Sequence, residues 1–179
     1  MASVGGHNGM IVAMAGLPGT GKSTLARALA DTGGGVVLDK DVIRSVLFPE
    51  GYVEYSNEQD DLCQSLMLET AGYLIQRHAG LRIFLDGRTF SRNYQVDRVI
   101  ETARRLNTDW RVIECVCDEE TARWRLEASG QSHPARNRSY ELYRRLRAEF
   151  EPITIPKLVV NTDTPLEECV KAARAYLEL

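Results

Sequence analysis

The sequence predicts an α/β fold in which a five-stranded parallel sheet lies between two layers of helices. Short apolar runs alternate with amphipathic segments along all 179 residues, and glycine-rich turns separate them. This length suits one domain with a substantial core, so residues 1–179 are expected to form a single unit. Residues 1–9 are expected to be a flexible leader, because they lack the basic and apolar regions of a signal peptide.

Each expected strand is a short apolar run followed by a segment with helical periodicity. The strands are expected at residues 10–15, 36–38, 81–85, 110–116 and 157–161. The helices are expected at residues 23–30, 41–48, 58–79, 93–106, 139–150 and 165–176, with another beginning after an N-cap at Asp118. Ligands of such sheets bind beyond the carboxyl ends of the strands, so the residues after each strand are the candidates for function.

Composition narrows the functional classes. A net charge of −3 does not suit a general nucleic-acid binder, and no apolar run approaches the roughly 20 residues that span a bilayer. The cysteines are interpreted as reduced thiols of a cytoplasmic protein, and no further metal ligands lie near the C-x-C pair in sequence. These cysteines are Cys63, Cys115, Cys117 and Cys169.

The most specific motif is GLPGTGKS at residues 16–23, which fits G-x-x-x-x-G-K-[ST] without exception and lies between a strand and a helix. Its glycines let backbone N–H groups turn toward phosphates, and the helix N-terminus adds partial positive charge. The motif predicts binding of ATP with Mg²⁺, with Lys22 on the β- and γ-phosphates and the Ser23 hydroxyl on the metal. The expected nucleotide-binding residues are Gly16, Pro18, Gly19, Thr20, Gly21, Lys22, Ser23 and Thr24.

Asp86 directly follows the apolar run at residues 81–85, which is where a phosphate-loop enzyme holds Mg²⁺. The alternative is a helix cap at the end of a strand. The loop at residues 160–165 is expected either to lie against the nucleotide base or to cap the last helix. It lacks the N-K-x-D pattern with which GTPases recognise guanine, so ATP is expected rather than GTP.

A second polar cluster follows the second strand. Asp41 and Arg44 are three residues apart at the start of a helix, so they share a face. Asp41 would accept the proton of a substrate hydroxyl and Arg44 would orient the acceptor. The alternative is an N-cap with a surface ion pair. Asp39 competes with Asp41 for the role of base, or binds the substrate.

These motifs together resemble a known family. The segment GLPGTGKSTLA at residues 16–26, the D-x-D-x-x-R pattern at residues 39–44 and the Asp-Gly after the third strand are similar to small P-loop kinases. The group includes zeta toxins, chloramphenicol phosphotransferase and polynucleotide kinases, with gluconate and adenylylsulfate kinases as more distant relatives. The resemblance covers nearly the whole chain. It implies a three-layer P-loop NTPase fold, Asp41 as the general base and Arg44 on the acceptor side.

Residues 121–147 resemble the arginine-bearing helical lid of this group, with seven arginines and two glutamates. Arginines stabilise the charge that spreads over a transferring phosphoryl group. Arg125 and Arg138 are the expected catalytic cations, with Arg123 and Arg136 as substitutes; any of them could instead be a solvated surface residue. The arginines expected on an exposed helix face are Arg144, Arg145 and Arg147.

The acceptor itself is less constrained. Arg88 and Arg92, four residues apart, would hold an anionic acceptor or line a surface helix. Residues 39–69 hold eight acidic and two basic residues, and residues 47–64, with Tyr52 and Tyr55, are expected to cover the acceptor pocket. An acidic cover disfavours nucleic acid and suits a neutral or cationic hydroxyl compound.

The expected function is therefore transfer of the γ-phosphoryl group of ATP to a hydroxyl of a small molecule, such as a sugar, a nucleoside or an antibiotic-like alcohol. Two alternatives stay open: a 5′-polynucleotide or nucleotide kinase, and an ATP-binding regulatory module without an acceptor. The oligomeric state is not predicted.

Overall fold

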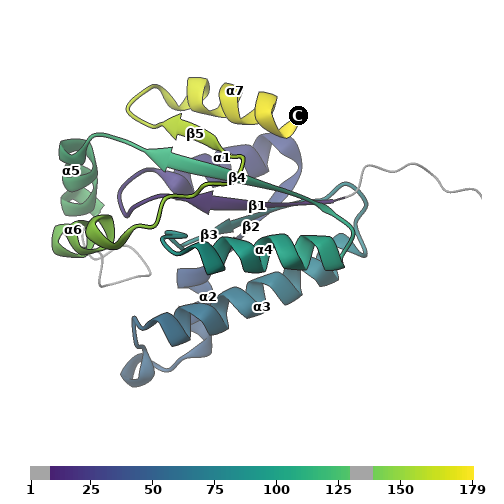
Figure 1. Cartoon of the computed structure of the whole chain (residues 1–179), viewed down its shortest axis with the longest axis horizontal. Helices are drawn as coiled ribbons and strands as arrows, with labels where there is room; N and C mark the ends of the chain where they lie inside the picture. The colour runs from purple at the N-terminus through teal and green to yellow at the C-terminus, as the bar shows by residue number, and fades with distance from the viewer. Residues whose placement is uncertain (1–8, 130–138) are drawn as a thin grey trace, which may run out of the picture.

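The structure, a computed structural model, describes residues 9–129 and 139–179 and consists of a parallel sheet between two helical layers (Figure 1). The strands are β1 (Met10–Ala15), β2 (Gly35–Asp39), β3 (Arg82–Asp86), β4 (Asp109–Val116) and β5 (Leu158–Asn161). The helices are α1 (Lys22–Gly33), α2 (Lys40–Leu47), the short 3₁₀ helix η1 (Glu50–Tyr52), α3 (Asn57–Ile75), α4 (Asn93–Arg105), α5 (Glu119–Ser129), α6 (Tyr140–Glu149) and α7 (Leu166–Leu177). The predicted fold class is confirmed.

The strand order β2-β3-β1-β4-β5 places the first strand in the centre of the sheet and the second at its edge. All four pairings are parallel. Every residue of β1 is buried, as its uninterrupted apolar sequence predicts. The loop after β1 therefore emerges at the middle of the sheet, between the ends of β3 and β4.

Two apolar cores hold the helices against the sheet. The larger joins one face of the sheet to α3 and α4, with Phe90 and Val99 among its fully buried side chains. The other joins the opposite face to α1 and α7, with Leu29 and Ala173 at its centre. Helices α5 and α6 lie beyond the carboxyl ends of the strands, where Tyr143 packs with Ala122 and Leu126 (Figure 1).

Several element ends differ from the sequence prediction. Helix α1 continues to Gly33, because Gly34 supplies the left-handed residue that ends it, with a φ of 66°. Helix α3 ends at Ile75, and the last expected residues, 76–79, form a turn. Asp39 rather than Asp41 caps α2, since its side chain accepts hydrogen bonds from the backbone N–H groups of Asp41 and Val42.

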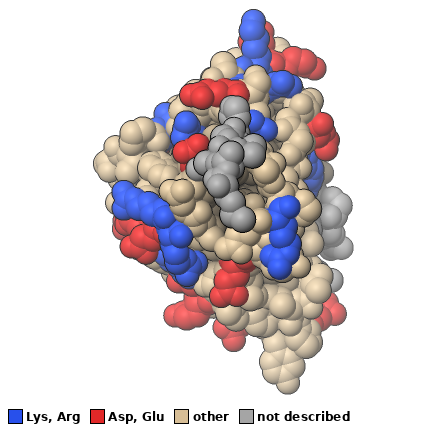
Figure 2. Space-filling model, turned by 90° about the vertical axis from the view of Figure 1, so that its right-hand side faces the viewer, with Lys and Arg blue, Asp and Glu red and all other residues tan. Residues whose placement is uncertain are grey.

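No helix among residues 9–129 and 139–179 is both long and apolar enough to cross a membrane. All four cysteines are free; three are buried, and Cys117 is partly exposed just beyond the end of β4. Acidic and basic residues are intermixed on the face opposite α5 and α6 (Figure 2).

Candidate active site

The phosphate loop joins β1 to α1, and its glycines have conformations that other residues rarely adopt. Gly16 has a φ of 131°, and a Cβ atom there would lie 2.3 Å from the carbonyl oxygen of Cys115. A side chain at this position would therefore push the loop off the end of β4. Lys22 folds back over the loop, and its Nζ donates to the carbonyl oxygen of Leu17 at 2.8 Å.

Two cavities flank the phosphate loop, and both are lined by Lys22 and Ser23. One, of about 480 Å³, lies between α1, α5 and the loop after β5 and is here called the nucleotide-side cavity. The other, of about 370 Å³, lies between α2, α3 and α6 and is here called the acceptor-side cavity. The predicted residues Gly19, Gly21 and Thr24 line the first, and Pro18 lines the second. Gly16 and Thr20 line neither of these cavities but a third one next to the end of β4.

Asp86, the residue expected to hold Mg²⁺, is the last residue of β3 and is fully buried. Neither of its carboxylate oxygens accepts a hydrogen bond from any described residue. Burying a carboxylate without partners is costly, so this position calls for a cation. Asp86 and the Ser23 hydroxyl thus fit a Mg²⁺ ion beside a bound phosphate chain.

Asp39 lies beside Asp86 but does not line the acceptor-side cavity. Its carboxylate caps α2 and lies 3.9 Å from the guanidinium of Arg27. Burial raises the pKa of the Asp39 carboxyl above its ordinary value, and the charge of Asp86 raises it further. Asp39 lines neither the acceptor-side nor the nucleotide-side cavity, and the predicted substrate contact by this residue stays a prediction.

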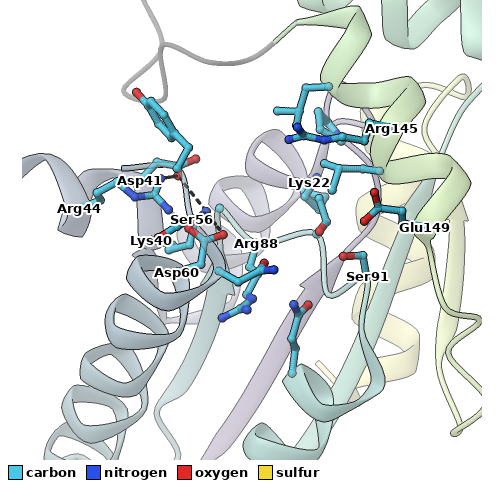
Figure 3. A pocket seen from close by; sticks show the side chains of 18 of the residues that line it. Lys22, Lys40, Asp41, Arg44, Ser56, Asp60, Arg88, Ser91, Arg145 and Glu149 are labelled. Atoms are coloured by element: carbon cyan, nitrogen blue, oxygen red, sulfur yellow. Dashed lines mark hydrogen bonds and ion pairs between the residues drawn. The ribbon is translucent and has the colours of Figure 1, made fainter. Parts of the chain in front are cut away.

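Asp41 and Arg44 do share one face of α2, and that face points into the acceptor-side cavity. The Arg44 guanidinium donates to Oδ1 of Asp41 at 2.8 Å, and only 3% of its side chain is exposed. The pair is therefore buried rather than lying on the surface. Lys40 and Asp60 complete the cluster, with Lys40 Nζ 3.2 Å from Asp41 and 3.0 Å from Asp60 (Figure 3).

Of the two alternatives for Arg88 and Arg92, the one in which both line a surface helix is wrong. Phe90, between them, has a φ of 53°, and α4 begins only at Asn93. Arg88 is buried and lines the acceptor-side cavity, but its guanidinium is held by Asp61 and Gln64, each at 2.6 Å. Arg92 lies outside the cavity and pairs with Glu149 and Glu151.

The described arginines of α5 have different surroundings. Arg125 donates to Thr162 and to the carbonyl oxygen of Gly19, so it lines the nucleotide-side cavity and connects α5 to the phosphate loop. Arg123 is exposed and pairs with Glu127. Arg136 and Arg138 lie outside the described residues.

Arg145 is exposed, as the sequence argument predicted, and it also lines the acceptor-side cavity. In Figure 3 it extends from α6 toward Lys22, with Glu149 one turn further along the helix. Among the described lid arginines, Arg145 is thus the one that lines the acceptor-side cavity, and its neighbour Arg144 is not part of that lining.

The loop after β5 contributes Thr162 and Thr164 to the nucleotide-side cavity, and Leu166 at the start of α7 lines it too. The loop also leads directly into that helix. The loop therefore borders the nucleotide-side cavity and also precedes the first turn of α7.

Comparison with known families supports the assignment of the fold. Residues 11–153 match the family described as AAA domain, which is most of the chain. The chain belongs to the AAA domain family. Its architecture is that of P-loop kinases, while the narrower resemblance to zeta toxins and chloramphenicol phosphotransferase stays a prediction.

Solved structures of low sequence identity have the same fold. A gluconokinase from Sinorhizobium meliloti 1021 is 18% identical with a TM-score of 0.68, covering 96% of this chain and 92% of its own. The APS kinase CysC of Mycobacterium tuberculosis, in complex with AMPPNP and APS, is 18% identical with a TM-score of 0.71, covering 97% and 99%. Chaetomium thermophilum Kti12, in complex with ADP-AlF3, is 16% identical with a TM-score of 0.69, covering 94% and 97%. A comparison with curated protein sequences found no match.

The residues that the sequence argument missed carry recognisable signals. In this AAA domain, one face of α6 is formed by four residues that recur at spacings of three and four. They are Leu142, Arg145, Leu146 and Glu149. The two leucines indicate that this face turns toward the protein, and Arg145 turns with them. Asp60 carries no such local signal, because its partners are 20 and 16 residues away on another helix.

Proposed function

We propose that this chain is an ATP- and Mg²⁺-dependent kinase that transfers the γ-phosphoryl group to a hydroxyl of a small molecule. The observation that carries the proposal is the pair of cavities that meet at Lys22 and Ser23. A nucleotide in one cavity and an alcohol in the other would meet at the phosphate loop. Membership of the AAA domain family and the likeness in fold to gluconokinase and APS kinase support it.

The proposed mechanism assigns each group around the loop a separate task. Lys22 binds the phosphate chain, and Arg145 stabilises the charge of the transferring group from α6. Ser23 and Asp86 would hold Mg²⁺, which would supply positive charge to neutralise the phosphates. Asp41 accepts the proton of the acceptor hydroxyl, and Arg44 fixes its carboxylate.

The cavity lining favours Asp41 over Asp39 as the base. Asp41 lines the acceptor-side cavity, whereas both of the Asp39 contacts that define its orientation are made within α2. A base must reach the proton that it removes, within hydrogen-bond distance or through one water. Asp41 meets this geometric condition.

The decisive experiment measures ATP consumption with Mg²⁺ in the presence of sugars, nucleosides, aminoglycosides and 5′-hydroxyl oligonucleotides, with products identified by mass. A phosphorylated small alcohol supports the proposal. A phosphorylated oligonucleotide indicates a polynucleotide kinase instead. Tight ATP binding with no product from any acceptor indicates a regulatory module.

Two variants separate the site from contaminating activity. Lys22→Met should abolish product formation, because the phosphate chain loses its cation. Lys171→Met removes the same charge from an exposed position on α7 and should leave turnover unchanged. Equal activity of the two variants would show that the product comes from another protein.

A further inference from the structure

The wall of the acceptor-side cavity opposite α6 consists of a closed network of four charged side chains, here called the charge quartet. Its members are Lys40, Asp41, Arg44 and Asp60. Lys40 Nζ donates to both carboxylate oxygens of Asp60 at 3.0 Å and lies 3.2 Å from Asp41. Arg44 contacts Asp41 at 2.8 Å and also pairs with Asp60. Two cations thus face two carboxylates, and their formal charges cancel.

The other buried cation on this side is also compensated. Arg88 lies 2.6 Å from the carboxylate of Asp61, a residue that is not part of the cavity lining, and it also donates to Gln64. Arg145 lies across the cavity, next to Lys22, where the transferring phosphoryl group would be (Figure 3). The three buried cations on the side of the cavity opposite α6 are Lys40, Arg44 and Arg88, and each of them therefore has a carboxylate partner.

Binding an anion in this half would require a cation to leave its carboxylate. The abandoned carboxylate would then be buried without a partner, which is strongly unfavourable. A hydroxyl group makes no such demand, because it accepts from lysine or arginine and donates to aspartate at the same time. Binding an ammonium group would be unfavourable for the corresponding reason, because a quartet carboxylate would have to leave the cation with which it already pairs.

Apart from the charge quartet, Arg88, Lys22 and the α6 residues Arg145 and Glu149, the lining of this cavity is uncharged. Ser56, Asn57, Ser91 and Gln95 contribute hydroxyl and amide groups, and Tyr55 places its ring 5.2 Å from the Arg44 guanidinium. The volume of about 370 Å³ is at the small end of the usual range for ligand pockets, roughly 300–1,000 Å³. Such a cavity has the size and chemistry to hold a compact molecule with several hydroxyls.

We propose that the acceptor is an uncharged polyhydroxylated molecule of monosaccharide or cyclitol size, and that the charge quartet recognises its hydroxyls and selects against charged analogues. The inference rests on the proposed kinase function and narrows its substrate class. It excludes nucleotides, sugar phosphates and sugar acids as preferred acceptors.

The test compares matched acceptors that differ only in charge. Neutral hexoses and cyclitols are assayed beside the carboxylate, phosphate and amine forms of the same skeletons, and kcat/KM is measured from mass-identified products. The neutral form of the best skeleton should exceed each charged form by at least about tenfold. Preference for a charged form would overturn the inference while leaving the kinase intact. No transfer to any acceptor, in this set or the wider panel, would overturn both.

Variants of the quartet test the physical reason. Asp60→Asn leaves one cation in excess, so the ratio of kcat/KM for the neutral form to that for the carboxylate form should fall by about tenfold. Lys40→Gln leaves one carboxylate in excess and should shift preference toward the amine form. Glu58→Gln makes the same charge change as Asp60→Asn at an exposed position on α3 and should leave the ratio unchanged.

The opposite changes in acceptor preference expected for the two variants distinguish recognition of the acceptor by the quartet from a merely structural role. A quartet that only stabilises the fold would lower kcat/KM for all acceptor forms by the same factor in both variants, and that result would overturn the inference. Thermal melting of each variant shows whether the protein is folded. If Asp60→Asn unfolds, Lys40→Gln alone gives the same test with the opposite sign.

Discussion

Asp39 and Asp86 are register partners at the carboxyl ends of β2 and β3, and Gly87 removes the side chain that would otherwise separate the two strand ends. A Cβ atom on Gly87 would lie 2.9 Å from Oδ1 of Asp39 and 3.0 Å from the backbone nitrogen of Lys40. Two carboxylates at adjacent strand ends repel each other unless a cation lies nearby. The fold thus places two mutually repelling carboxylates at the position where a kinase binds its metal ion.

Asp86→Asn should stabilise the metal-free protein and remove its response to Mg²⁺. The substitution replaces a buried carboxylate without hydrogen-bond partners by a neutral amide, so the melting temperature in EDTA should rise by about 2–4 °C. Mg²⁺ with ADP should then stabilise the variant less than the native protein. Asp97→Asn, on the exposed face of α4, is the control. A native Mg²⁺ response in Asp86→Asn would show that the metal binds elsewhere.

The effects of Asp41→Asn and Asp39→Asn on turnover should show which of the two aspartates is the general base and which only caps α2. Loss of a general base lowers turnover by about 10²–10⁴, so Asp41→Asn should fall within that range. Asparagine caps helices about as well as aspartate, so Asp39→Asn should keep α2 intact and lose less than about tenfold. Steady-state kinetics with the identified acceptor give both numbers. The reverse order of the two effects would assign the base to Asp39.

Arg145→Ala should lower kcat by about 10²–10³, because its charge faces the region of phosphoryl transfer. Arg144→Ala removes an adjacent, exposed arginine from the same helix and should change kcat by less than about twofold. Comparable kcat values for the two variants would place the stabilising cation outside α6.

Lys40 should make the stability of the protein depend on pH in the alkaline range. Burial lowers its pKa from 10.5 to about 8, the charge of Asp41 opposes this shift, and the charges of Arg44 and Arg88 add to it. Asp60 also faces Lys40 from α3. Between about pH 8 and 10.5 the unfolded chain binds the proton that the folded chain has lost, so the free energy of unfolding contributed by Lys40 rises with pH.

Urea unfolding at about pH 8 and about pH 10 measures this contribution. Other groups titrate in the same range, so the informative quantity is the difference between the native protein and Lys40→Met. The native protein should gain more stability, or lose less, than the variant as the pH rises. Identical changes in the two proteins would mean that Lys40 keeps its ordinary pKa.

Arg125→Lys should weaken ATP binding more than it slows transfer. The guanidinium contacts the hydroxyl and carbonyl of Thr162 at 2.9 and 2.8 Å, and an ammonium group does not reproduce that fork. KM for ATP should rise by about tenfold with a smaller change in kcat. Arg123→Lys, in an exposed pair with Glu127, should have native kinetics. A fall confined to kcat would return Arg125 to the catalytic role that the sequence suggested.

Local sequence patterns predicted the helices and strands of this fold, but they did not predict the order of the strands in the sheet. The fully apolar β1, the phosphate loop and the Asp-Gly after β3 each lie where the sequence placed them, because their signals lie within a few residues. The sheet order depends on which strands the connecting helices bring together. For the same reason the shared face of Asp41 and Arg44 was predictable, whereas Asp60, on another helix, was not.

The arginines show where charge patterns mislead. Arg88 and Arg92 have helical spacing, but the left-handed Phe90 interrupts the helix that the spacing implies. Arg145 is exposed, as its basic segment suggests, but it shares a face of α6 with Leu142 and Leu146, and that face lines the acceptor-side cavity. A charged residue carries no information on its own orientation; the apolar residues beside it do.

The position of β2 at the edge of the sheet has an evolutionary consequence. The phosphate loop follows the central strand β1, where a change in the backbone would disturb the two neighbouring strands at once. The segment from α2 through α3, which carries the charge quartet, begins at the edge strand β2, which has a single neighbour, and leads to β3. New acceptor specificities can therefore arise by exchanging residues or lengthening the chain on this outer segment, while the machinery that handles the phosphates stays the same.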